Sequence, residues 1–317
     1  MSLHETSIAC LACGSNTSTL WAAARDVEYR TSSESFNYRR CEACAALFID
    51  PVPETRLSEI YPPNYYSYAI PGRSLVYAIK QWLDRRFFRS LLAALPGERL
   101  RVLDVGGGAG WELSSLRNTD SRVQETLVVD FDPGAAEIAR KNGHRYFCGR
   151  IEDYQTADRF DLVLLLNLIE HVRHPAQVLR KIHSLLSPDG AVLIKTPNYR
   201  SWDAALFRHL SWAGYHCPRH WVIFTEESFT RLVLKCGLAI RSATYTQGSS
   251  FWSASILAWL AARHIVRITK ERPVFDHPLF APIAAVFAAV DFLRRPFART
   301  SQMFFVLEKV RGNGSNS

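Results

Sequence analysis

Four of the seven cysteines stand in two C-x-x-C pairs, a spacing that is typical of a metal site. One pair is Cys10 with Cys13, and the other is Cys41 with Cys44. Two such turns can bring four thiolates to one tetrahedral Zn²⁺, and a closed shell of four sulfur ligands leaves no position for a substrate. Redox-active C-x-x-C motifs normally occur singly at the start of a helix, so we favour structural zinc over a redox role or chance. The ion would stabilise a segment of about 50 residues with little core of its own.

A glycine-rich turn follows an apolar strand pattern and opens a helical one. Asp104 lies at the end of the strand, and the spacing D-x-G-x-G-x-G continues through Gly106, Gly108 and Gly110. Glycines at such a turn let the backbone approach a ligand while helix N-terminal N–H groups point outward. An acid still on the strand fits poorly with a dinucleotide's pyrophosphate and suits a ligand with an ammonium group. The next strand ends in Asp130, where a carboxylate can accept both hydroxyls of a ribose.

Together these residues resemble the class I S-adenosylmethionine-dependent methyltransferases. Residues 102–110 look like the first motif of that family, and residues 149–153 fall where the family holds the adenine ring, although the acid frequent at the position of Arg150 is missing. Residues 167–175, 185–190 and 196–198 are similar to its fourth and fifth strand regions. The resemblance covers about residues 45–250. It implies S-adenosylmethionine as cofactor, with contacts from Asp104, Gly106, Gly108, Gly110, Asp130, Phe131, Ile151, Glu152 and Asn167.

A narrower resemblance is to bacterial methyltransferases that act on sugars and surface polysaccharides. Those often carry an N-terminal pair of C-x-x-C motifs, a Y-P-x-x-Y-Y linker and a W-x-G-x-x-x-P-R-H stretch. The last two match residues 61–66 and 212–220 here. The resemblance implies methyl transfer to a saccharide-type acceptor, small or lipid-linked, and at a hydroxyl oxygen.

Two histidines are placed where an acceptor would lie. His171 follows the carboxyl end of the predicted fourth strand, where open α/β sheets bind ligands, and His220 lies in the loop after the fifth. We expect His171 to be the general base, with His220 as its partner or substitute. Glu170 should point to the opposite face if the strand geometry continues, and as a carboxylate it would be the weaker base. For the nearby aromatic residues two interpretations stand side by side, walls of the acceptor pocket or packing of a loop, and they are Trp212, Tyr215 and Trp221.

The elements that must position these residues alternate between apolar strands and amphipathic helices. Strand patterns at residues 100–105, 126–130, 160–166 and 191–195 are separated by helical ones. The run 160–166 is apolar on both faces, as a central parallel strand between two layers of helices must be. The pattern predicts an α/β fold with a Rossmann-like methyltransferase sheet, mostly parallel with the last strand antiparallel, a small N-terminal β zinc module and a helical insertion before the last strand.

Four parts follow along the chain: a zinc-binding module (1–50), a linker and N-terminal helix (51–98), a cofactor-binding core (99–248), and a helical insertion with the final strand (249–317). The net charge of +8 comes from residues 199–317, which hold 15 basic and 7 acidic side chains. We expect residues 249–299 to dock on an anionic membrane or lipid-linked substrate, with a homodimer interface or helical cap as an equal alternative. The start of the chain has no signal-peptide pattern, which predicts a cytoplasmic protein. If residues 249–299 dock on a membrane, the protein would be peripheral to its inner face.

Two alternative functions fit parts of the sequence. A nucleic-acid methyltransferase is suggested by the basic charge and the zinc module, but Asn167-Leu-Ile-Glu170 replaces the N-P-P-Y-type sequence of base-methylating enzymes. The basic excess also lacks a compact run with stacking aromatics, so nucleic acid is not the expected partner. A non-catalytic cofactor-binding scaffold is the third hypothesis.

Overall fold

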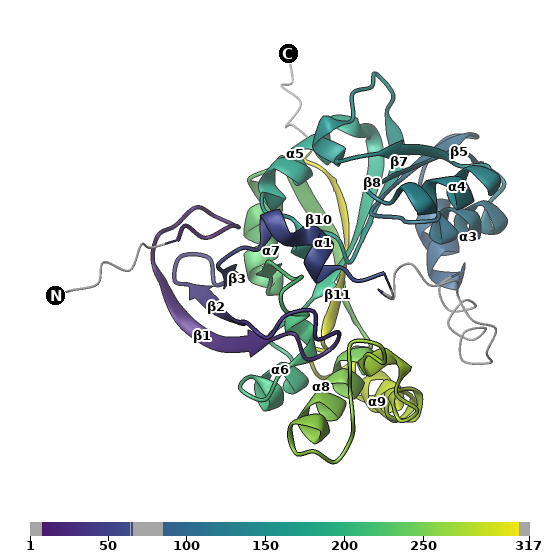
Figure 1. Cartoon of the computed structure of the whole chain (residues 1–317). Coiled ribbons are helices and arrows are strands. Elements are labelled where there is room, and N and C mark those ends of the chain that lie inside the picture. The colour runs from purple at the N-terminus through teal and green to yellow at the C-terminus, as the bar shows by residue number, and fades with distance from the viewer. Residues whose placement is uncertain (1–7, 64, 66–84, 311–317) are drawn as a thin grey trace.

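A seven-stranded sheet forms the centre of the molecule, described by a computed structural model for residues 8–63, 65 and 85–310 (Figure 1). Its strand order is β10-β11-β8-β7-β4-β5-β6. The strands β4 to β8 run parallel to one another, whereas β11 is antiparallel to both β8 and β10. This confirms the predicted Rossmann-like methyltransferase sheet. The strands are β4 (Leu100–Val105), β5 (Val123–Asp130), β6 (Arg145–Cys148), β7 (Phe160–Leu166), β8 (Leu186–Pro197), β10 (Leu238–Thr246) and β11 (Gln302–Lys309).

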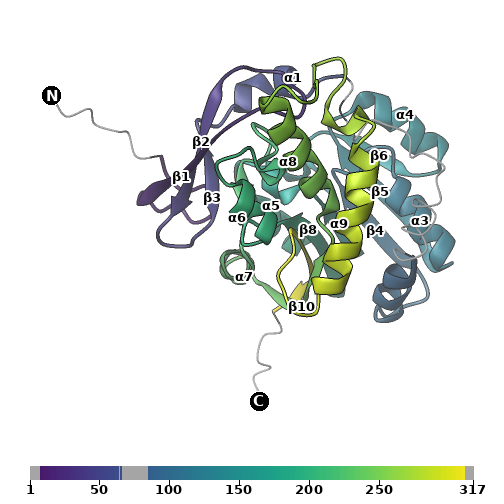
Figure 2. The ribbon, with the colours of Figure 1, turned by 90° about the horizontal axis from the view of Figure 1, so that it is seen from below.

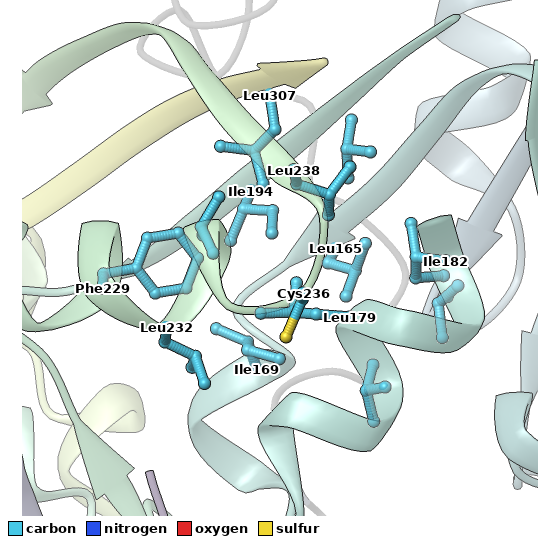
Figure 3. Packing of buried hydrophobic residues seen from close by; sticks show 14 of the residues in the cluster. Leu165, Ile169, Leu179, Ile182, Ile194, Phe229, Leu232, Cys236, Leu238 and Leu307 are labelled. Atoms are coloured by element: carbon cyan, nitrogen blue, oxygen red, sulfur yellow. The ribbon is translucent and has the colours of Figure 1, made fainter. Parts of the chain in front are cut away.

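The central strand β7 is apolar on both faces because each face packs against helices. Leu162 and Leu164 belong to one buried cluster, and Val163 and Leu165 to the other. The first cluster includes α3 (Trp111–Thr119), α4 (Pro133–Lys141) and helical residues 85–93. The second includes α5 (Pro175–Leu185) and α7 (Glu226–Leu234), as Figure 3 shows. Of the linker and N-terminal helix predicted at 51–98, residues 85–93 are helical, and residues 64 and 66–84 lie outside the described residues.

Strand β8 includes residues of turn-forming types. Residues 187–190 (Ser-Pro-Asp-Gly) favour a turn between helix and strand, but β8 already begins at Leu186. The pairing of β7 with β8 is interrupted there: Phe160 faces Leu186, and Leu162 faces Ala191. The four residues are therefore taken up as an irregularity inside the strand.

The N-terminal segment shares its sheet with the core. It contributes β1 (Ser18–Arg25), β2 (Ser35–Cys41) and β3 (Leu47–Asp50), and β3 pairs with β9 (Val222–Ile223), which follows β8 along the chain. Trp212, Tyr215 and Trp221 are buried in the core under this sheet, as the loop-packing interpretation of these aromatic residues expects.

The insertion before the last strand is helical, as predicted. It consists of α8 (Ser249–Ala262) and α9 (Phe280–Arg294), which lie side by side in Figure 2. Within the described residues, no helix has the length and apolar character needed to cross a membrane. Within the described part of the chain, the remaining helices are α1 (Leu57–Ile60), α6 (Trp202–Phe207) and short 3₁₀ turns at Glu54–Arg56, Ile151–Asp153, Ile169–His171, Ala213–Tyr215 and Val274–Asp276.

Candidate functional site

The glycine-rich turn lies at the carboxyl end of β4, against the side chain of Asp104. A Cβ atom on Gly107 would lie 2.3 Å from the Asp104 carboxylate, so only glycine fits there. Asp104 is buried, and its Oδ2 has no hydrogen-bond partner among the described residues. Burial, with a smaller contribution from Glu112, raises the pKa of Asp104 well above its usual value. The turn thus holds a carboxyl group that lacks a donor.

The same turn contacts the loop that follows β7. Gly106, Gly108 and Gly110 all have positive φ values, which explains their residue type. A Cβ atom on Gly106 would lie 2.9 Å from the Leu168 side chain. Leu168 precedes Glu170 by two residues, so the turn lies beside the loop that carries Glu170 and His171.

The end of β5 fixes Asp130 beside the glycine turn. Its Oδ2 accepts a hydrogen bond from the Gly108 N–H at 2.9 Å, and its Oδ1 accepts one from the Asp132 N–H at 3.1 Å. The neighbouring Phe131 is 59% exposed, and the Arg150 guanidinium lies 6.0 Å from its ring centroid. Beyond β6, Ile151 is buried and Glu152 is half-buried. An acid, an exposed aromatic ring and an aliphatic surface therefore follow the carboxyl ends of adjacent strands.

Asn167 completes this side of the site from the end of β7. Its backbone is left-handed, with a φ of 56°, which asparagine tolerates better than most residues. Its Oδ1 is buried and, like Asp104 Oδ2, has no partner within the described part of the chain. Buried acceptors without donors are costly. Two such acceptors, at the carboxyl ends of the neighbouring strands β4 and β7, fit a ligand that brings N–H or O–H groups, as the methionine and ribose parts of S-adenosylmethionine do.

The loop after β7 corrects one premise of the sequence argument. Ile169–His171 forms a 3₁₀ turn rather than an extended strand, so Glu170 and His171 do not point to opposite faces. The ligand atoms of Glu170, His171 and His220 lie within 4.8 Å of one another. Glu170 Oε2 accepts a hydrogen bond from Thr196 Oγ1 at 3.1 Å, while its Oε1 has no hydrogen-bond partner among the described residues.

Backbone carbonyls determine how the two imidazoles are protonated. His171 Nδ1 lies 3.0 Å from the Arg219 carbonyl oxygen and 2.9 Å from the Tyr61 hydroxyl. His220 Nδ1 lies 2.8 Å from the Gly214 carbonyl oxygen. A carbonyl can only accept, so we assign the proton to Nδ1 in both rings. Each Nε2 then carries a lone pair, and that of His220 lies 3.9 Å from Glu170 Oε1.

Burial also reverses the expected order of basicity. It lowers the pKa of His171 to about 3, with repulsion from His216 adding to the effect. It lowers the pKa of His220 well below its usual value. Burial raises the pKa of Glu170 to about 8. The expectation that the carboxylate is the weaker base is therefore wrong for these groups as they stand, and Glu170 is largely protonated at neutral pH.

Several residues of the site were missed. Arg219 donates from Nη2 to Asp26 at 2.7 Å, and both side chains are fully buried. His216 bonds through Nδ1 to Glu28 and through Nε2 to the Tyr65 hydroxyl at 2.9 Å. The aromatic linker and the P-R-H stretch pointed to this region, but nothing in the spacing of Asp26 and Glu28 did. The N-terminal module thus supplies two acids beside residues 212–220, which we call the acceptor loop.

Among the described residues, two sets could hold a metal ion. In the cysteine cluster, Cys10 and Cys44 have their Sγ atoms 3.7 Å apart, and Cys13 and Cys41 have theirs 3.6 Å apart. Sulfur ligands on a tetrahedral zinc lie about 3.8 Å apart, so the cluster has the dimensions of a zinc site. The second set is Glu170, His171 and His220, whose donor atoms resemble a two-histidine, one-carboxylate ligand set.

Comparison with known proteins bears on this site. A family model described as "Methyltransferase domain" matches residues 78–243, just over half of the chain. Ubiquinone biosynthesis O-methyltransferases are also similar: that of Bradyrhizobium diazoefficiens is 32% identical over 38% of this chain and 48% of its own length. That of Pseudomonas aeruginosa is 33% identical over 40% of this chain and 53% of its own. The chain spans about half the length of the curated relatives it matches.

Solved structures with the same kind of sheet are more distant. The [4+2]-cyclase SpnF has a TM-score of 0.48 and 16% identity over 72% of this chain and 82% of its own. Coclaurine N-methyltransferase, bound to N-methylheliamine and SAH, has a TM-score of 0.48 and 15% identity over 76% of each chain. Similarity at this level is too weak to bear on the chemistry.

Proposed function

The chain belongs to the methyltransferase-domain family, and from this premise we propose that it methylates a hydroxyl oxygen of a saccharide-type acceptor, small or lipid-linked. Methyl transfer from S-adenosylmethionine is the activity of the family, so the non-catalytic scaffold is set aside. The observation that carries the proposal is the convergence of Glu170, His171 and His220 beside the glycine turn.

The cofactor, when bound, supplies a methyl group on a sulfonium, which is already a good leaving group. Asp104 and Asn167 would hold its methionine part through their buried oxygens. Asp130 would accept hydrogen bonds from the ribose hydroxyls, partly in place of the bond that it now accepts from the Gly108 N–H. Phe131 and Ile151 would enclose the adenine ring, with Glu152 beside them. The protein's remaining task is to align an acceptor oxygen behind the methyl group and to receive its proton.

His171 is the proposed proton acceptor. Its Nδ1–H is held by the Arg219 carbonyl, which leaves Nε2 free to accept. The low pKa of the buried ring means that it is neutral, but also that an imidazolium there needs a negative partner. Glu170 supplies that charge when it ionises. His220, whose ring centroid lies 4.6 Å from that of His171, is the partner or substitute.

The polar surroundings favour a saccharide over an apolar acceptor. Tyr61, Tyr65, Glu28 and Arg219 bring hydroxyl, carboxylate and guanidinium groups to the acceptor side. Of these, Tyr61 is half-buried, whereas Tyr65, Glu28 and Arg219 are buried and already paired within the fold, so a sugar hydroxyl would meet the Tyr61 hydroxyl first. A second candidate is a phenolic hydroxyl, favoured by the names of the relatives above. A phenol loses its proton more readily, so it would depend less on His171.

We also propose structural zinc in the cysteine cluster. The thiols are buried or half-buried close together, and the pKa of Cys44 is lowered to about 5 by a hydrogen bond from Cys10. Gly14 and Ala45, each one residue after a C-x-x-C pair, both have positive φ and donate back to the first cysteine of the pair. The two turns thus have the same geometry, as two halves of one closed zinc site would.

The acceptor can be tested directly with isotopically labelled S-adenosylmethionine and cell extract separated into nucleic acid, polar saccharide, lipid-linked saccharide and phenolic lipid. The proposal expects label in a saccharide fraction, and none with the His171→Asn variant. Label in the phenolic fraction would support the second candidate, and label in nucleic acid would revive the function set aside from the sequence.

A further inference from the structure

Helix α9 is oriented with its charged side chains inward. Asp291 and Arg294 are the buried residues of this helix. Asp291 accepts from the Gly248 N–H at 2.7 Å at the start of α8, and from Arg294 Nε at 2.8 Å. The Arg294 guanidinium also lies over the Trp202 ring, 4.7 Å from its centroid. Asp291 and Arg294 therefore hold α9 against α8 and Trp202.

The opposite side of α9 is apolar and exposed. Val286, Val290 and Leu293 recur at the spacing i, i+4 and i+7, which places them in one stripe, and Phe297 follows in the turn after the helix ends at Arg294. They are 60%, 40%, 72% and 89% exposed, respectively. Phe292 beside them is 64% exposed. We call these five residues the outer face of α9. Single exposed apolar residues need no explanation, but a stripe of this length marks a site of interaction.

The inner side of α9 connects this face to the acceptor loop. Phe287 stacks on Trp252 of α8 with ring centroids 4.4 Å apart. On α8, Ser255 Oγ accepts a hydrogen bond from the N–H of Ala213 at 2.8 Å. Ala213 begins the 3₁₀ turn that leads to His216 and His220. A surface that covers the outer face of α9 would therefore be separated from the acceptor loop by the helices α9 and α8.

Basic side chains surround the outer face at both ends of the helix pair. Residues 249–299 hold seven arginines and lysines but three acids, one of which is the buried Asp291. Six of the basic residues are exposed: Arg263, Arg267, Lys270 and Arg272 between the helices, and Arg295 and Arg299 after α9, of which Arg299 is paired with Glu227 at 3.0 Å. An apolar stripe with a positive rim is typical of a helix that lies in a membrane interface.

We propose that the outer face of α9 docks on the surface of an anionic lipid bilayer. The apolar side chains enter the boundary between headgroups and acyl chains, and the basic rim contacts anionic headgroups. The rim distinguishes this occupant from a second copy of the chain, because a two-fold contact through the same face would bring two positive rims together. The inference goes beyond methyl transfer and does not depend on which acceptor is used.

The test is flotation of the full chain with vesicles of phosphatidylcholine alone or mixed with phosphatidylglycerol, at low and high salt. Wild type should float with the anionic vesicles at low salt, and less with neutral vesicles or at high salt, which screens the charges. Leu293→Glu combined with Phe297→Glu should lower partitioning by about tenfold or more. Leu234→Glu, at an exposed leucine of α7, is the matched control and should float like wild type.

Three results would overturn the proposal. Absence of flotation at low salt excludes this lipid surface. Equal flotation of the double variant assigns membrane binding to another part of the chain. A dimer in solution that the double variant converts to a monomer, without flotation of wild type, makes the second copy the occupant.

Discussion

Glu170 Oε1 lies 3.9 Å from His220 Nε2, although the two residues come from loops that follow different strands. Glu170 is fully buried, and this oxygen has no hydrogen-bond partner among the described residues. The imidazole cannot donate to it while its proton is held on Nδ1 by the Gly214 carbonyl. Because burial raises the pKa of Glu170 to about 8, its carboxyl group holds a proton at neutral pH and faces the lone pair on His220 Nε2. A proton taken from an acceptor hydroxyl could pass between such groups.

Replacement of His171 by Asn or Ala should lower turnover by about 10²–10⁴-fold, because it removes the proposed general base. Affinity for S-adenosylmethionine should stay nearly unchanged, and calorimetry checks this. His174→Asn, an exposed histidine of the same loop, is the control and should retain activity. Wild-type turnover in both His171 variants would move the base elsewhere, and His220→Ala then tells whether the second histidine takes the role.

The pH profile should report Glu170. With its pKa raised to about 8, the carboxylate form grows as pH rises through 8, so turnover of the wild type should rise in the same range. Glu170→Gln keeps the shape of the side chain and cannot ionise. It should therefore lose this rise and remain at a low rate. A profile with the same midpoint in Glu170→Gln would assign the titration to another group.

The same group should make the free energy of unfolding depend on pH. A carboxyl whose pKa is higher in the folded state than in the unfolded chain stabilises the fold at low pH and loses that contribution as pH rises. Between about pH 4.5 and 8 the wild type should lose about 1.4 kcal/mol per pH unit relative to Glu170→Gln. Denaturant titrations at several pH values measure this difference. Parallel curves for the two proteins would show that Glu170 is not buried as described.

The sheet could be predicted because its signals are local. Strand patterns such as 160–166 and the glycine turn depend on neighbours in the chain, and β7 and the turn lie where expected. The pairing of β3 with β9 could not be predicted, since it joins residues about 175 positions apart and leaves no periodic pattern in the sequence. Asp26 and Glu28 were missed for the same reason: a buried acid is recognised by its partner, and Arg219 and His216 are distant in sequence.

The error about Glu170 had a different physical cause. Alternation of side chains holds only while the backbone is extended, and the chain turns into a 3₁₀ segment at Ile169. Its basicity was also judged from the usual carboxyl pKa, whereas burial decides the value here. Sequence gives residue types and their order, but the degree of burial depends on segments that meet only in the fold.

Substitution of Asp130 by Ala should weaken the binding of S-adenosylmethionine by about 1.5–3 kcal/mol, or about 10-fold to 150-fold in the dissociation constant, because it removes a charged acceptor for the ribose hydroxyls. Calorimetry with the cofactor measures the change. Asp158→Ala, an acid paired with Arg145 at the surface, serves as the control. An unchanged dissociation constant for Asp130→Ala would contradict the assignment.

Elemental analysis should find one zinc ion per chain in protein purified without chelator. Cys41→Ala should lose the ion and lower the melting temperature, because a structural metal contributes directly to folding. Cys148→Ser, an exposed cysteine outside the cluster, should keep both. Absence of metal in wild-type protein with unmodified thiols would rule out the zinc site. If chelation instead abolishes activity while zinc stays in the protein, the ion in question is at Glu170, His171 and His220.

The buried pair of Arg219 and Asp26 should make the acceptor loop dependent on the N-terminal module. Burial alone would raise the pKa of Asp26, but attraction and hydrogen bonds from Arg219 lower it, so the acid is ionised in the fold. Removing one partner leaves the other charge buried and unpaired, and Asp26→Asn should cost about 3–5 kcal/mol of stability. The double variant Asp26→Asn with Arg219→Met should recover part of that loss, since no unpaired charge remains. Arg219 also donates from Nε to the Ile60 carbonyl and positions the backbone that holds His171. We therefore expect the double variant to regain stability but not turnover, as measured by denaturant titration and labelled methyl transfer. Full activity in the stabilised double variant would show that the pair holds the fold together without positioning the site.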